Sequence, residues 1–542
     1  MKSNRKFQLA FKIILVLFFI YAGAYIFLSS FVVGGERYFV LNDDAMISMR
    51  YAHNLARGEG LVWNPGELVE GISNPLWTFY MAFWHLLPIS ASKMSLPIQI
   101  TGLLLLTANL FFVRKIALYV TKNEWITLGA VFLTAFYEPL IRWSLLGMEV
   151  SALVLILNIA LWQTLQASEN GEFDQRPYIL LGLSTFIRIE MAVPLLLLLM
   201  INLYFDESHR RKHITFGITM LIASIGLQSL LRFMYFGEWL PNTYYLKITG
   251  IPLFVRIGNG LTSLLSLVWN TGWLLALLPF SILLFRRDRV TFTLSLIFLA
   301  QLAYSVYVGG DAWEHKGGAN RYISIVMPLF FILLAYSAHR ILEMLIADVN
   351  GKWLSAEKIR HGLLIAFVLL TLMQVNSTLS NNLSISCCPP RISQITSSGF
   401  RSNINFAESH EDYVRTSLAL MSFTTPEASI AIVAAGTIPY FTDLPAIDLL
   451  GKSDTYIARL DSQLPNGPLA QLTSYRPGHS KWDYSYSLGE LQPDIVVQLW
   501  DDADQAQAFL QEYSVVEIDG LAFKVKNDSP NILWEKVTLV EQ

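Results

Sequence analysis

The densest group of ionisable residues in the first half of the chain lies between Leu41 and Leu76. It opens with the adjacent acids Asp43 and Asp44, which follow a long apolar stretch. A carboxylate in this place can act as a general base, and a cation such as Arg50 can bind an anion or keep the base ionised. Polar chemistry at an apolar boundary suggests a site for an amphiphilic substrate.

The acid pair also has a purely structural interpretation. Residues 42–44 are expected to open a helix that runs to about Ala56. An Asp at such a position can cap the helix, because it satisfies unpaired backbone amides and suits the helix dipole. Two consecutive acids exceed what one cap requires, and helical spacing places Asp43 and Arg50 along one face. One carboxylate can therefore cap the helix while the other serves as a base.

Other residues in this loop and in later polar segments are candidates for holding a substrate. Ionisable groups at membrane depth are unfavourable unless they are paired or functional. The candidates for substrate binding are His53, Glu70, Asn74, Glu149, Arg188, Glu190, Asn242, Asp311 and His315. The candidates for binding a phosphate are Arg50, Lys247, Lys316 and Arg321.

Several of these candidates have a plainer interpretation. Glu70 is equally explained as a surface carboxylate, and Lys247 as a lysine that snorkels to the membrane surface. Arg188 and Glu190 can form an ion pair with a structural role only. His315 is favoured as a polar loop residue over a metal ligand. At the level of sequence these alternatives stay open.

The composition places all of these residues in a membrane protein. The 542 residues are 53% hydrophobic and 15% charged, whereas ordinary soluble domains are roughly 25% charged. Apolar stretches of sufficient length predict about eleven transmembrane helices. The expected spans are 9–33, 97–117, 124–140, 146–166, 177–205 (two short spans that break around Arg188), 214–234, 265–285, 290–308, 322–341 and 362–378.

The positions of Lys and Arg set the expected orientation, because cytoplasmic loops retain these residues. If residues 76–88 form a surface or re-entrant helix and not a span, the basic clusters between the spans all face the cytoplasm. The acid-rich first loop, the other polar segments and the tail after the last span then lie on the opposite side. The sequence therefore predicts one site on the extracytoplasmic face.

Hydropathy falls to soluble values after the last expected span. The linker that contains Cys387 and Cys388 is expected to separate a transmembrane domain, residues 1–378, from a soluble domain, residues 379–542. Short buried strands are predicted at 429–434, 445–450, 493–499 and 521–525, and a helical stretch at 503–513. This pattern predicts a small α/β domain.

Several classes of function lack support in the sequence. The net charge of −3, without a basic tail, argues against nucleic acid as a partner. The adjacent Cys387 and Cys388 exclude a disulfide framework, although they can form a strained vicinal bridge, and they lack zinc-site spacing. Phosphate-loop, HExxH and GxSxG motifs are absent. No cofactor is expected, and a divalent metal requirement is left open.

The loop DDAMISMRYAHNLARGEGLVWNPGELVEGISNPLW (43–77) resembles the first periplasmic loop of the GT-C glycosyltransferases related to mycobacterial arabinofuranosyltransferase AftB. The likeness recurs in YFGEWLPNTYYLK (235–247), YVGGD (307–311) with Arg321 ahead of the next span, AAGTIPYFTDLPAIDLLGKSD (434–454) and GHSKWDY (478–484). These motifs extend over nearly the whole chain. The insert 313–320 before Arg321 departs from the family pattern and puts the acceptor in doubt.

The resemblance implies a GT-C fold with about eleven transmembrane helices and a periplasmic α/β domain. It implies an inverting enzyme of the bacterial inner membrane that takes a sugar, arabinofuranose, from a polyprenyl-phosphate donor. The loop aspartate that acts as base in the family falls on Asp43 or Asp44. The implied acceptor is a periplasmic cell-envelope glycan, lipopolysaccharide or pilin.

A transporter or flippase of lipid-linked sugars, without transferase chemistry, is the alternative. Such proteins usually contain internal repeats with polar residues at the middle of the bilayer. The charged residues of this chain are instead expected to gather at one face. This difference favours the transferase.

Overall fold

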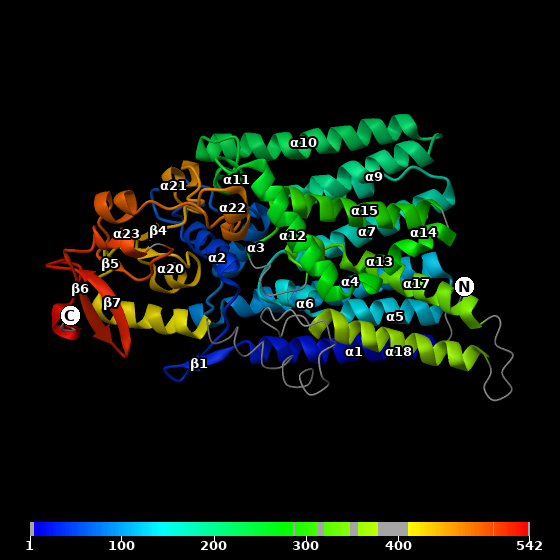
Figure 1. Cartoon of the computed structure of the whole chain (residues 1–542), viewed down its shortest axis with the longest axis horizontal. Helices are drawn as coiled ribbons and strands as arrows, with labels where there is room; N and C mark the ends of the chain where they lie inside the picture. Colours follow the sequence, from blue (N-terminus) through cyan, green and yellow to red (C-terminus); the bar gives the residue numbers. More distant parts are fainter. Residues whose placement is uncertain are drawn as a thin grey trace. The chain divides into compact units, whose positions relative to one another are not determined.

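The computed structural model describes residues 5–285, 288–312, 319–346, 356–377, 410–501 and 503–539 (Figure 1). The chain divides into two compact units according to contacts between residues. Unit 1 comprises Met1–Phe27, Gln99–Gln228 and Arg256–Asn403, and unit 2 comprises Leu28–Ile98, Ser229–Val255 and Ile404–Gln542.

Unit 1 is built from helices in the part of the chain that the structure describes. They are α1 (Arg5–Leu28), α4 (Ser95–Thr121), α5 (Glu124–Ala135), α6 (Glu138–Leu145), α7 (Val150–Asn170), α8 (Arg176–Ser184), the 3₁₀ turn η2 (Ile189–Met191), α9 (Ala192–Phe205), α10 (Arg210–Phe236), α12 (Leu253–Thr271), α13 (Trp273–Leu277), η3 (Leu278–Ser281), α14 (Ile282–Phe285), α15 (Arg289–Val308), α16 (Arg321–Ser324), α17 (Met327–Ile346) and α18 (Ala356–Ser377). The first residues of α4 and α12 and the last turns of α10 belong to unit 2.

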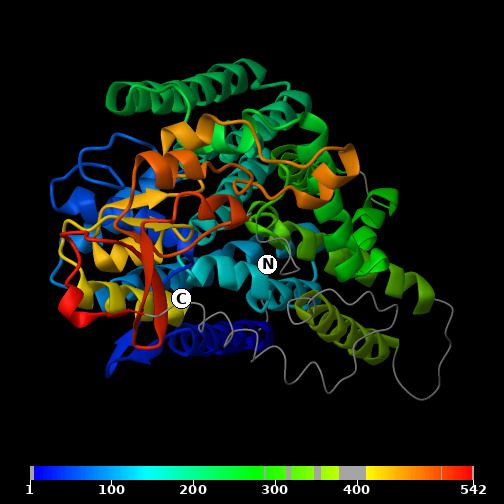
Figure 2. The same cartoon turned by 60° about the vertical axis from the view of Figure 1, so that its left-hand side comes forward.

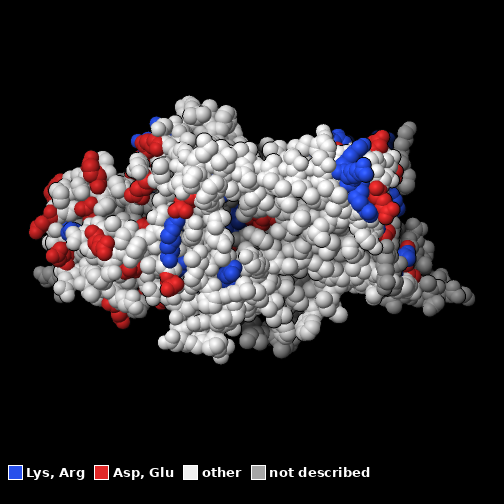
Figure 3. All heavy atoms as spheres, turned by 90° about the horizontal axis from the view of Figure 1, so that it is seen from above, with Lys and Arg blue, Asp and Glu red and all other residues white. Residues whose placement is uncertain are grey.

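The chain is a multi-pass membrane protein by the length and composition of its helices. In the part of the chain that the structure describes, six helices are long and apolar enough to cross a membrane, or seven if the bent pair Asn242–Ile248 and Leu253–Thr271 forms one span. The six are Arg5–Leu28, Ala91–Thr121, Val150–Asn170, Arg210–Phe236, Arg289–Val308 and Met327–Met344. On the face in Figure 3, Lys and Arg gather in a few places and large areas are uncharged, which fits this assignment.

The expected count of eleven spans is not confirmed. Four of the remaining expected segments form shorter apolar helices, namely Glu124–Ala135, Ile189–Phe205, Trp273–Leu284 and His361–Asn376. Glu124–Ala135 has 12 residues, and a helix of that length is about 18 Å long, whereas the hydrocarbon core of a bilayer is about 30 Å thick. Hydropathy reports apolar residues but not the turns that interrupt a helix, so by itself it does not give the number of spans, and the count of eleven stays a prediction.

Unit 2 contains the segments that the sequence analysis singled out for chemistry. Its elements are β1 (Phe31–Val33), β2 (Glu36–Tyr38), α2 (Asp43–Ala56), α3 (Pro75–His85), η1 (Ala91–Lys93), α11 (Asn242–Ile248), helical residues 410–423, β3 (Ile430–Ile432), α20 (Thr437–Thr442), β4 (Ala446–Asp448), α21 (Thr455–Arg459), α22 (Pro468–Ser474), the π-helix η5 (Ser485–Glu490), β5 (Ile495–Val496), α23 (Ala503–Gln507), β6 (Tyr513–Ile518), β7 (Leu521–Lys526), η6 (Trp534–Lys536) and β8 (Thr538–Leu539).

The main sheet of unit 2 has the strand order β4-β3-β5-β7-β6-β8. β3 pairs in parallel with β4 and β5, and the other neighbours are antiparallel. The loop after β4 leaves the carboxyl end of a parallel strand, where α/β proteins commonly place functional residues. Figure 2 shows β6 and β7 as adjacent red arrows.

Four of these strands lie where the sequence predicted them, but the expected helix at 503–513 is wrong in its second half. α23 ends at Gln507 and β6 begins at Tyr513. The sequence carries a signal for this hairpin, namely the pair Asp519-Gly520. In the structure both residues adopt positive φ, 52° and 76°. An Asp-Gly pair between two apolar runs is a strong hairpin signal.

The core of unit 2 joins the first loop to the C-terminal part of the chain. Ile47 and Tyr51 of α2 and Trp63 belong to the same buried cluster as Ile430 and Ile432 of β3. Each large apolar side chain buried in this way stabilises a fold by about 1.5–3 kcal/mol. The expected boundary after residue 378 stays a prediction, but the unit that contains the sheet also contains the acid-rich loop.

Candidate active site

The two acids at the start of α2 are not its side-chain cap. The cap is Asn42, whose Oδ1 accepts the backbone N–H of Asp44 at 3.3 Å. An Asn at this position satisfies one of the unpaired amides of the first turn. The carboxylates of Asp43 and Asp44 are directed to other partners, and these partners differ.

Asp43 connects α2 to the start of α20. Its Oδ1 accepts the backbone N–H and the hydroxyl of Thr437 at 2.8 and 2.9 Å, and its Oδ2 accepts the N–H of Gly436 at 3.3 Å. The residue is 9% exposed. Burial raises the pKa of Asp43, and the charge of Lys452 and the bonds from Thr437 act against this rise. These hydrogen bonds indicate that the Asp43 carboxylate holds the start of α20 against α2.

Asp44 forms an ion pair with Lys452. The Lys452 Nζ donates to Asp44 Oδ1 at 2.7 Å, and the lysine and aspartate side chains are 14% and 18% exposed, respectively. Burial by itself lowers the pKa of Lys452, but the carboxylates of Asp44, Asp43 and Asp448 outweigh it, so the pKa is raised. Lys452 is therefore a cation, and its partner carboxylate keeps contact with solvent.

The loop that carries Lys452 is shaped by Asp448 at the end of β4. The Asp448 carboxylate accepts the backbone N–H of Leu450 at 3.0 Å and that of Ser453 at 2.8 Å. Gly451 adopts a φ of +76°, a conformation that L side chains rarely adopt. Bonds from a buried side chain to two points of a short loop hold its backbone in one shape.

Asn242, the first residue of α11, holds the same loop from another side. Its Nδ2 donates to the carbonyl oxygens of Gly451 and Lys452 at 3.0 Å each and to that of Asp454 at 3.1 Å. The side chain is 5% exposed. The structure thus places Asn242, predicted to bind substrate, where it positions the backbone of Lys452.

His479 lies near this ion pair as a neutral imidazole. Burial lowers its pKa to about 4, and the nearby charge of Lys452 contributes. Its Nδ1 donates to the carbonyl of Pro477 at 3.0 Å, and its ring lies 5.4 Å from that of Trp500. Lys247 lies close by, since a Cβ on the neighbouring Gly478 would meet its Cε at 3.2 Å.

Arg50 is buried, at 1% exposure, and its donors are directed to oxygens of the protein. Its Nε donates to the carbonyl of Trp63 at 2.7 Å, its Nη2 to that of Leu444 at 2.9 Å, and its Nη1 to that of Pro439. A guanidinium has five N–H donors, so most of its capacity is used. This geometry favours a role in holding α2 over the predicted role in binding a phosphate.

His53 lies in an aromatic cluster with His85 and Tyr440. The ring of His53 is 5.7 Å from that of His85 and 6.0 Å from that of Tyr440, and His85 Nε2 is 3.1 Å from the Tyr440 hydroxyl. Burial lowers the pKa of His53, and it lowers that of His85 to about 4. Both rings are thus neutral at pH 7.

The predicted substrate-binding residues Glu70 and Asn74 have protein partners. Glu70 forms a two-point ion pair with Arg232, with Oε1 3.3 Å from Nη2 and Oε2 bonded to Nε; the side chains are 6% and 7% exposed. Asn74 Oδ1 accepts the hydroxyl of Ser48 at 2.9 Å and that of Thr78 at 3.2 Å. Both side chains fix the first loop.

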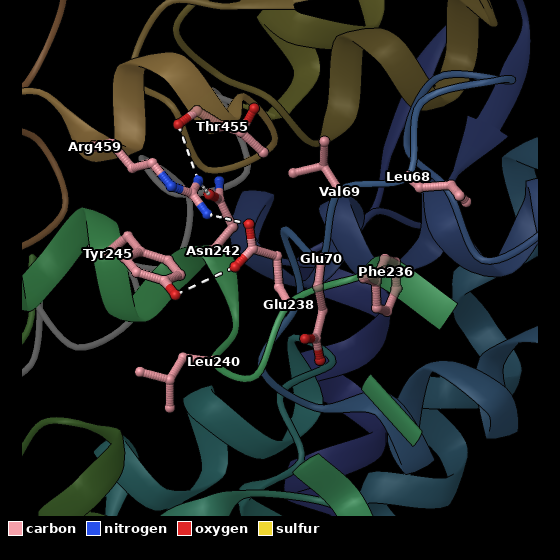
Figure 4. Close-up of a pocket in the computed structure, with 10 residues that line it drawn as sticks. All are labelled: Leu68, Val69, Glu70, Phe236, Glu238, Leu240, Asn242, Tyr245, Thr455 and Arg459. Carbon is pink, nitrogen blue, oxygen red and sulfur yellow. Dashed lines mark hydrogen bonds and ion pairs between the residues drawn. The ribbon is translucent and has the colours of Figure 1, made fainter. Parts of the chain in front are cut away.

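A shallow pocket in unit 2 has a volume of about 230 Å³, including its open mouth (Figure 4). Arg459 Nη2 lies 2.6 Å from Glu238 Oε1, and the Tyr245 hydroxyl donates to Glu238 Oε2 at 3.3 Å. The guanidinium lies 4.2 Å from the centre of the Tyr245 ring. The lining is Leu68, Val69, Glu70, Phe236, Glu238, Leu240, Asn242, Tyr245, Thr455 and Arg459.

Unit 1 brings together three other predicted residues. Arg188 Nε lies 2.7 Å from Glu190 Oε1, and its Nη1 lies 3.3 Å from Glu149 Oε1. The three side chains are 1–6% exposed. The cation and the two carboxylates therefore compensate one another away from water, in line with the expectation that such groups are paired.

Asp311 and Arg321 form a second buried pair in unit 1. Arg321 Nε lies 3.0 Å from Asp311 Oδ2, and its Nη2 donates to Oδ1 at 3.4 Å. The guanidinium of Arg321 is 5.4 Å from the ring of Tyr322, and that of Arg188 is 5.7 Å from it. The two pairs thus share one aromatic ring. His315 and Lys316 lie outside the described residues.

The structure places three side chains, Lys452, His479 and Arg232, beside the predicted ones, although the sequence analysis did not single them out. Lys452 and His479 both lie in motifs that carried the resemblance, 434–454 and 478–484. Arg232 near the end of an expected span was a further signal, because an ionisable residue there calls for a partner. Within the described ranges, no group of three or more His, Cys, Asp or Glu side chains could hold a metal ion.

Comparisons with known proteins agree with this architecture. Residues 402–532 match the family model described as a domain of unknown function (DUF8728). The crystal structure of ArnT from Cupriavidus metallidurans bound to undecaprenyl phosphate is similar, with 12% identity and a TM-score of 0.52 over 95% of this chain and 98% of that chain. ArnT in the apo state gives 14% identity and 0.50 over 94% and 97%. Comparison with curated protein sequences finds no match.

At these identities the likeness concerns the fold. It supports the fold that the resemblance implied, while membership of the GT-C glycosyltransferases and the likeness to AftB in particular stay predictions. The mostly helical chain with its small sheet shares the fold of ArnT.

Proposed function

We propose that this protein is a membrane glycosyltransferase that moves a sugar from a polyprenyl-phosphate donor to a hydroxyl group of an acceptor. The observation that carries the proposal is the likeness to ArnT over 95% of the chain, in a structure where ArnT is bound to undecaprenyl phosphate. The acid pair at the start of α2 supports it, because it supplies a carboxylate with solvent contact beside a cation.

In the proposed step, the acceptor oxygen bonds to the anomeric carbon from the side opposite the phosphate. The bond from that carbon to the phosphate oxygen breaks, and polyprenyl phosphate leaves with the electron pair, so the configuration inverts. A carboxylate of the protein takes the hydroxyl proton. Reactions of this kind depend mainly on positioning and on stabilisation of charge.

Asp44 fits the role of this base better than Asp43. The Asp43 carboxylate is 9% exposed and accepts three hydrogen bonds from the start of α20. The Asp44 side chain is 18% exposed, and it lies beside the cation of Lys452. A base must reach the proton that it removes, so a carboxylate in contact with solvent is the better candidate.

The donor phosphate needs cationic partners, and two described residues are proposed for this role separately. Lys247 in unit 2 makes no ion pair with any described residue, which suits a lysine that meets a ligand. Arg321 in unit 1 is held by Asp311, and its planar guanidinium suits two-point binding of a phosphate. Lys316 lies outside the described residues and stays a prediction for the same role.

The remaining details of the proposal rest on the resemblance of the first loop. They are arabinofuranose as the sugar, a cell-envelope glycan, lipopolysaccharide or pilin as the acceptor, and the periplasmic face of the inner membrane as the location. The side is tested with single cysteines at the exposed positions Glu67 and Arg211. A maleimide that cannot cross the membrane should label Glu67→Cys, and not Arg211→Cys, in spheroplasts.

The function is tested with purified protein and a radiolabelled polyprenyl-phosphate arabinofuranose. The expected result is label on a glycan acceptor together with release of polyprenyl phosphate, which Asp44→Asn abolishes. A donor that carries glucose on the same lipid serves as the control for sugar selectivity. Movement of intact donor across a liposome membrane, with no label on acceptor, would support the flippase alternative and contradict the transferase.

A further inference from the structure

We propose that Lys452 is the positioning residue of the general base, which it holds ionised and in one orientation from the loop after β4. The inference rests on the proposed function and goes beyond it, because it assigns a required part of the catalytic machinery to the C-terminal segment.

The ion pair has the geometry that such a role requires. The ammonium and the Asp44 carboxylate oxygen are 2.7 Å apart, and both side chains are more than four-fifths buried, at 14% and 18% exposure. Partial burial strengthens the attraction, since less water screens it than at a surface. The Lys452 ammonium donates to Oδ1 of the carboxylate.

The backbone of Lys452 is fixed before any substrate arrives. Asp448 accepts the N–H of Ser453 at 2.8 Å, and Asn242 donates to the carbonyl of Lys452 itself at 3.0 Å. A long lysine side chain is normally mobile, so anchoring its main chain on both sides reduces the freedom lost when it pairs. This is the arrangement of a supporting residue behind a reacting group.

The other titratable groups around the pair differ in the charge that they bring. Asp43 on α2 and Asp448 on β4 are carboxylates that favour the charged form of Lys452. Burial keeps His479 neutral, with a pKa of about 4, so it does not replace the lysine as a cation. Tyr413, whose pKa burial raises to about 12, stays neutral as well. Lys247 is a further nearby cation, and its effect is measured with a separate variant.

The kinetic test compares the pH dependence of kcat/KM in Lys452→Met and the parent. Without the ammonium the Asp44 carboxylate is easier to protonate, so the acidic limb of the profile should move to a pH about 1–3 higher. At a pH below both limbs, kcat/KM of Lys452→Met should be lower than that of the parent, by about tenfold for each pH unit by which the limb has moved. Lys452→Arg should keep the limb near its original place.

Two control variants separate this role from others. Lys536→Met removes an exposed lysine of the same unit, which donates to the carbonyl of Ser422 at 3.1 Å, and should leave the profile unchanged. Lys247→Met should raise the donor KM without moving the limb. If Lys452→Met raised only the donor KM, or lowered kcat with no movement of the limb, the positioning role would be wrong.

A second measurement does not depend on activity. Thermal unfolding of Lys452→Met, Asp44→Asn and the double variant gives the coupling between the two side chains as a double-mutant cycle. The losses in Tm should be less than additive at pH 7, and this coupling should vanish as the carboxylate is protonated at low pH. Additive losses at all pH values contradict the inference. Coupling in a protein with no sugar transfer would contradict the proposed function alone.

Discussion

Unit 1 and unit 2 each hold a group of charged side chains, but the two groups are built differently. In unit 1 the side chains of Arg188 and Glu149 are 6% and 1% exposed, and every described member of the group faces an opposite charge. In unit 2 the pair of Asp44 and Lys452 is 18% and 14% exposed. Some members of both groups were predicted from the sequence, but only the pair in unit 2 is in clear contact with solvent.

The difference teaches which charges can take part in chemistry. A buried ion pair releases a proton or binds a new ion only after its internal contacts break, and an unpaired charge in such a place is strongly unfavourable. A partly exposed carboxylate can exchange a proton without that rearrangement. We therefore assign proton transfer to unit 2 and expect the group of Arg188, Glu149 and Glu190 in unit 1 to contribute to stability.

The largest expected effect concerns the base. Asp44→Asn should lower kcat by about 10²–10⁴-fold, because a positioned base contributes that much, with a loss in Tm limited to its ion pair with Lys452. Steady-state transfer kinetics and thermal unfolding measure the two quantities. Asp43→Asn is the matched variant and should lower Tm more, since it disturbs the bonds to Thr437. A reversed order of the two effects on kcat would exchange the roles of the acids.

The next effect concerns the buried group of Arg188, Glu149 and Glu190 in unit 1. Arg188→Met leaves Glu149 and Glu190 without their cation and should destabilise the protein by about 3–5 kcal/mol. Arg176→Met is the control in the same unit, because Arg176 is 68% exposed in its pair with Asp174, and an exposed pair contributes about 0–1 kcal/mol. Denaturant unfolding in detergent compares them. Similar losses would remove the proposed distinction between the units.

A smaller effect is expected at Arg321. Arg321→Lys keeps the charge but loses the planar fork that binds two phosphate oxygens, so the donor KM should rise about tenfold while the acceptor KM changes little. The measurement varies each substrate in turn. Because Asp311 also loses a two-point contact, Tm is recorded beside the kinetics. Equal effects on both substrates would leave Arg321 with a structural role only.

The smallest effect is the dependence of stability on pH through two buried histidines of unit 2. Burial lowers the pKa of His85 and His479 to about 4, from 6.5 when exposed. The unfolded chain then binds more protons than the folded one between these values, so stability falls as pH falls from about 6.5 to 4. From pH 8 to 6 the loss should be about 1 kcal/mol per histidine. His479→Gln should reduce this loss, and an unchanged slope would place the effect elsewhere.

Much of the local structure follows from the sequence. The helix expected from residue 42 to about Ala56 is observed as Asp43–Ala56, because a cap residue and helical spacing act within a few residues. Four short strands were found from apolar runs. The strand at 513–518 was missed, since the Asp519-Gly520 turn was not considered. The count of eleven membrane spans stays a prediction, because hydropathy does not register breaks in helices.

The sequence by itself determined that this is a membrane protein with an acid pair after its first apolar stretch. Only the tertiary structure decided the partners. Asp44 meets Lys452 across 408 positions, and Glu70 meets Arg232 across 162. Local patterns define which residues can be charged and where helices start, but the partner of a charge depends on distant segments packing in one core. That packing is set by the fold as a whole, so it cannot be recognised from residues at a fixed spacing in the sequence.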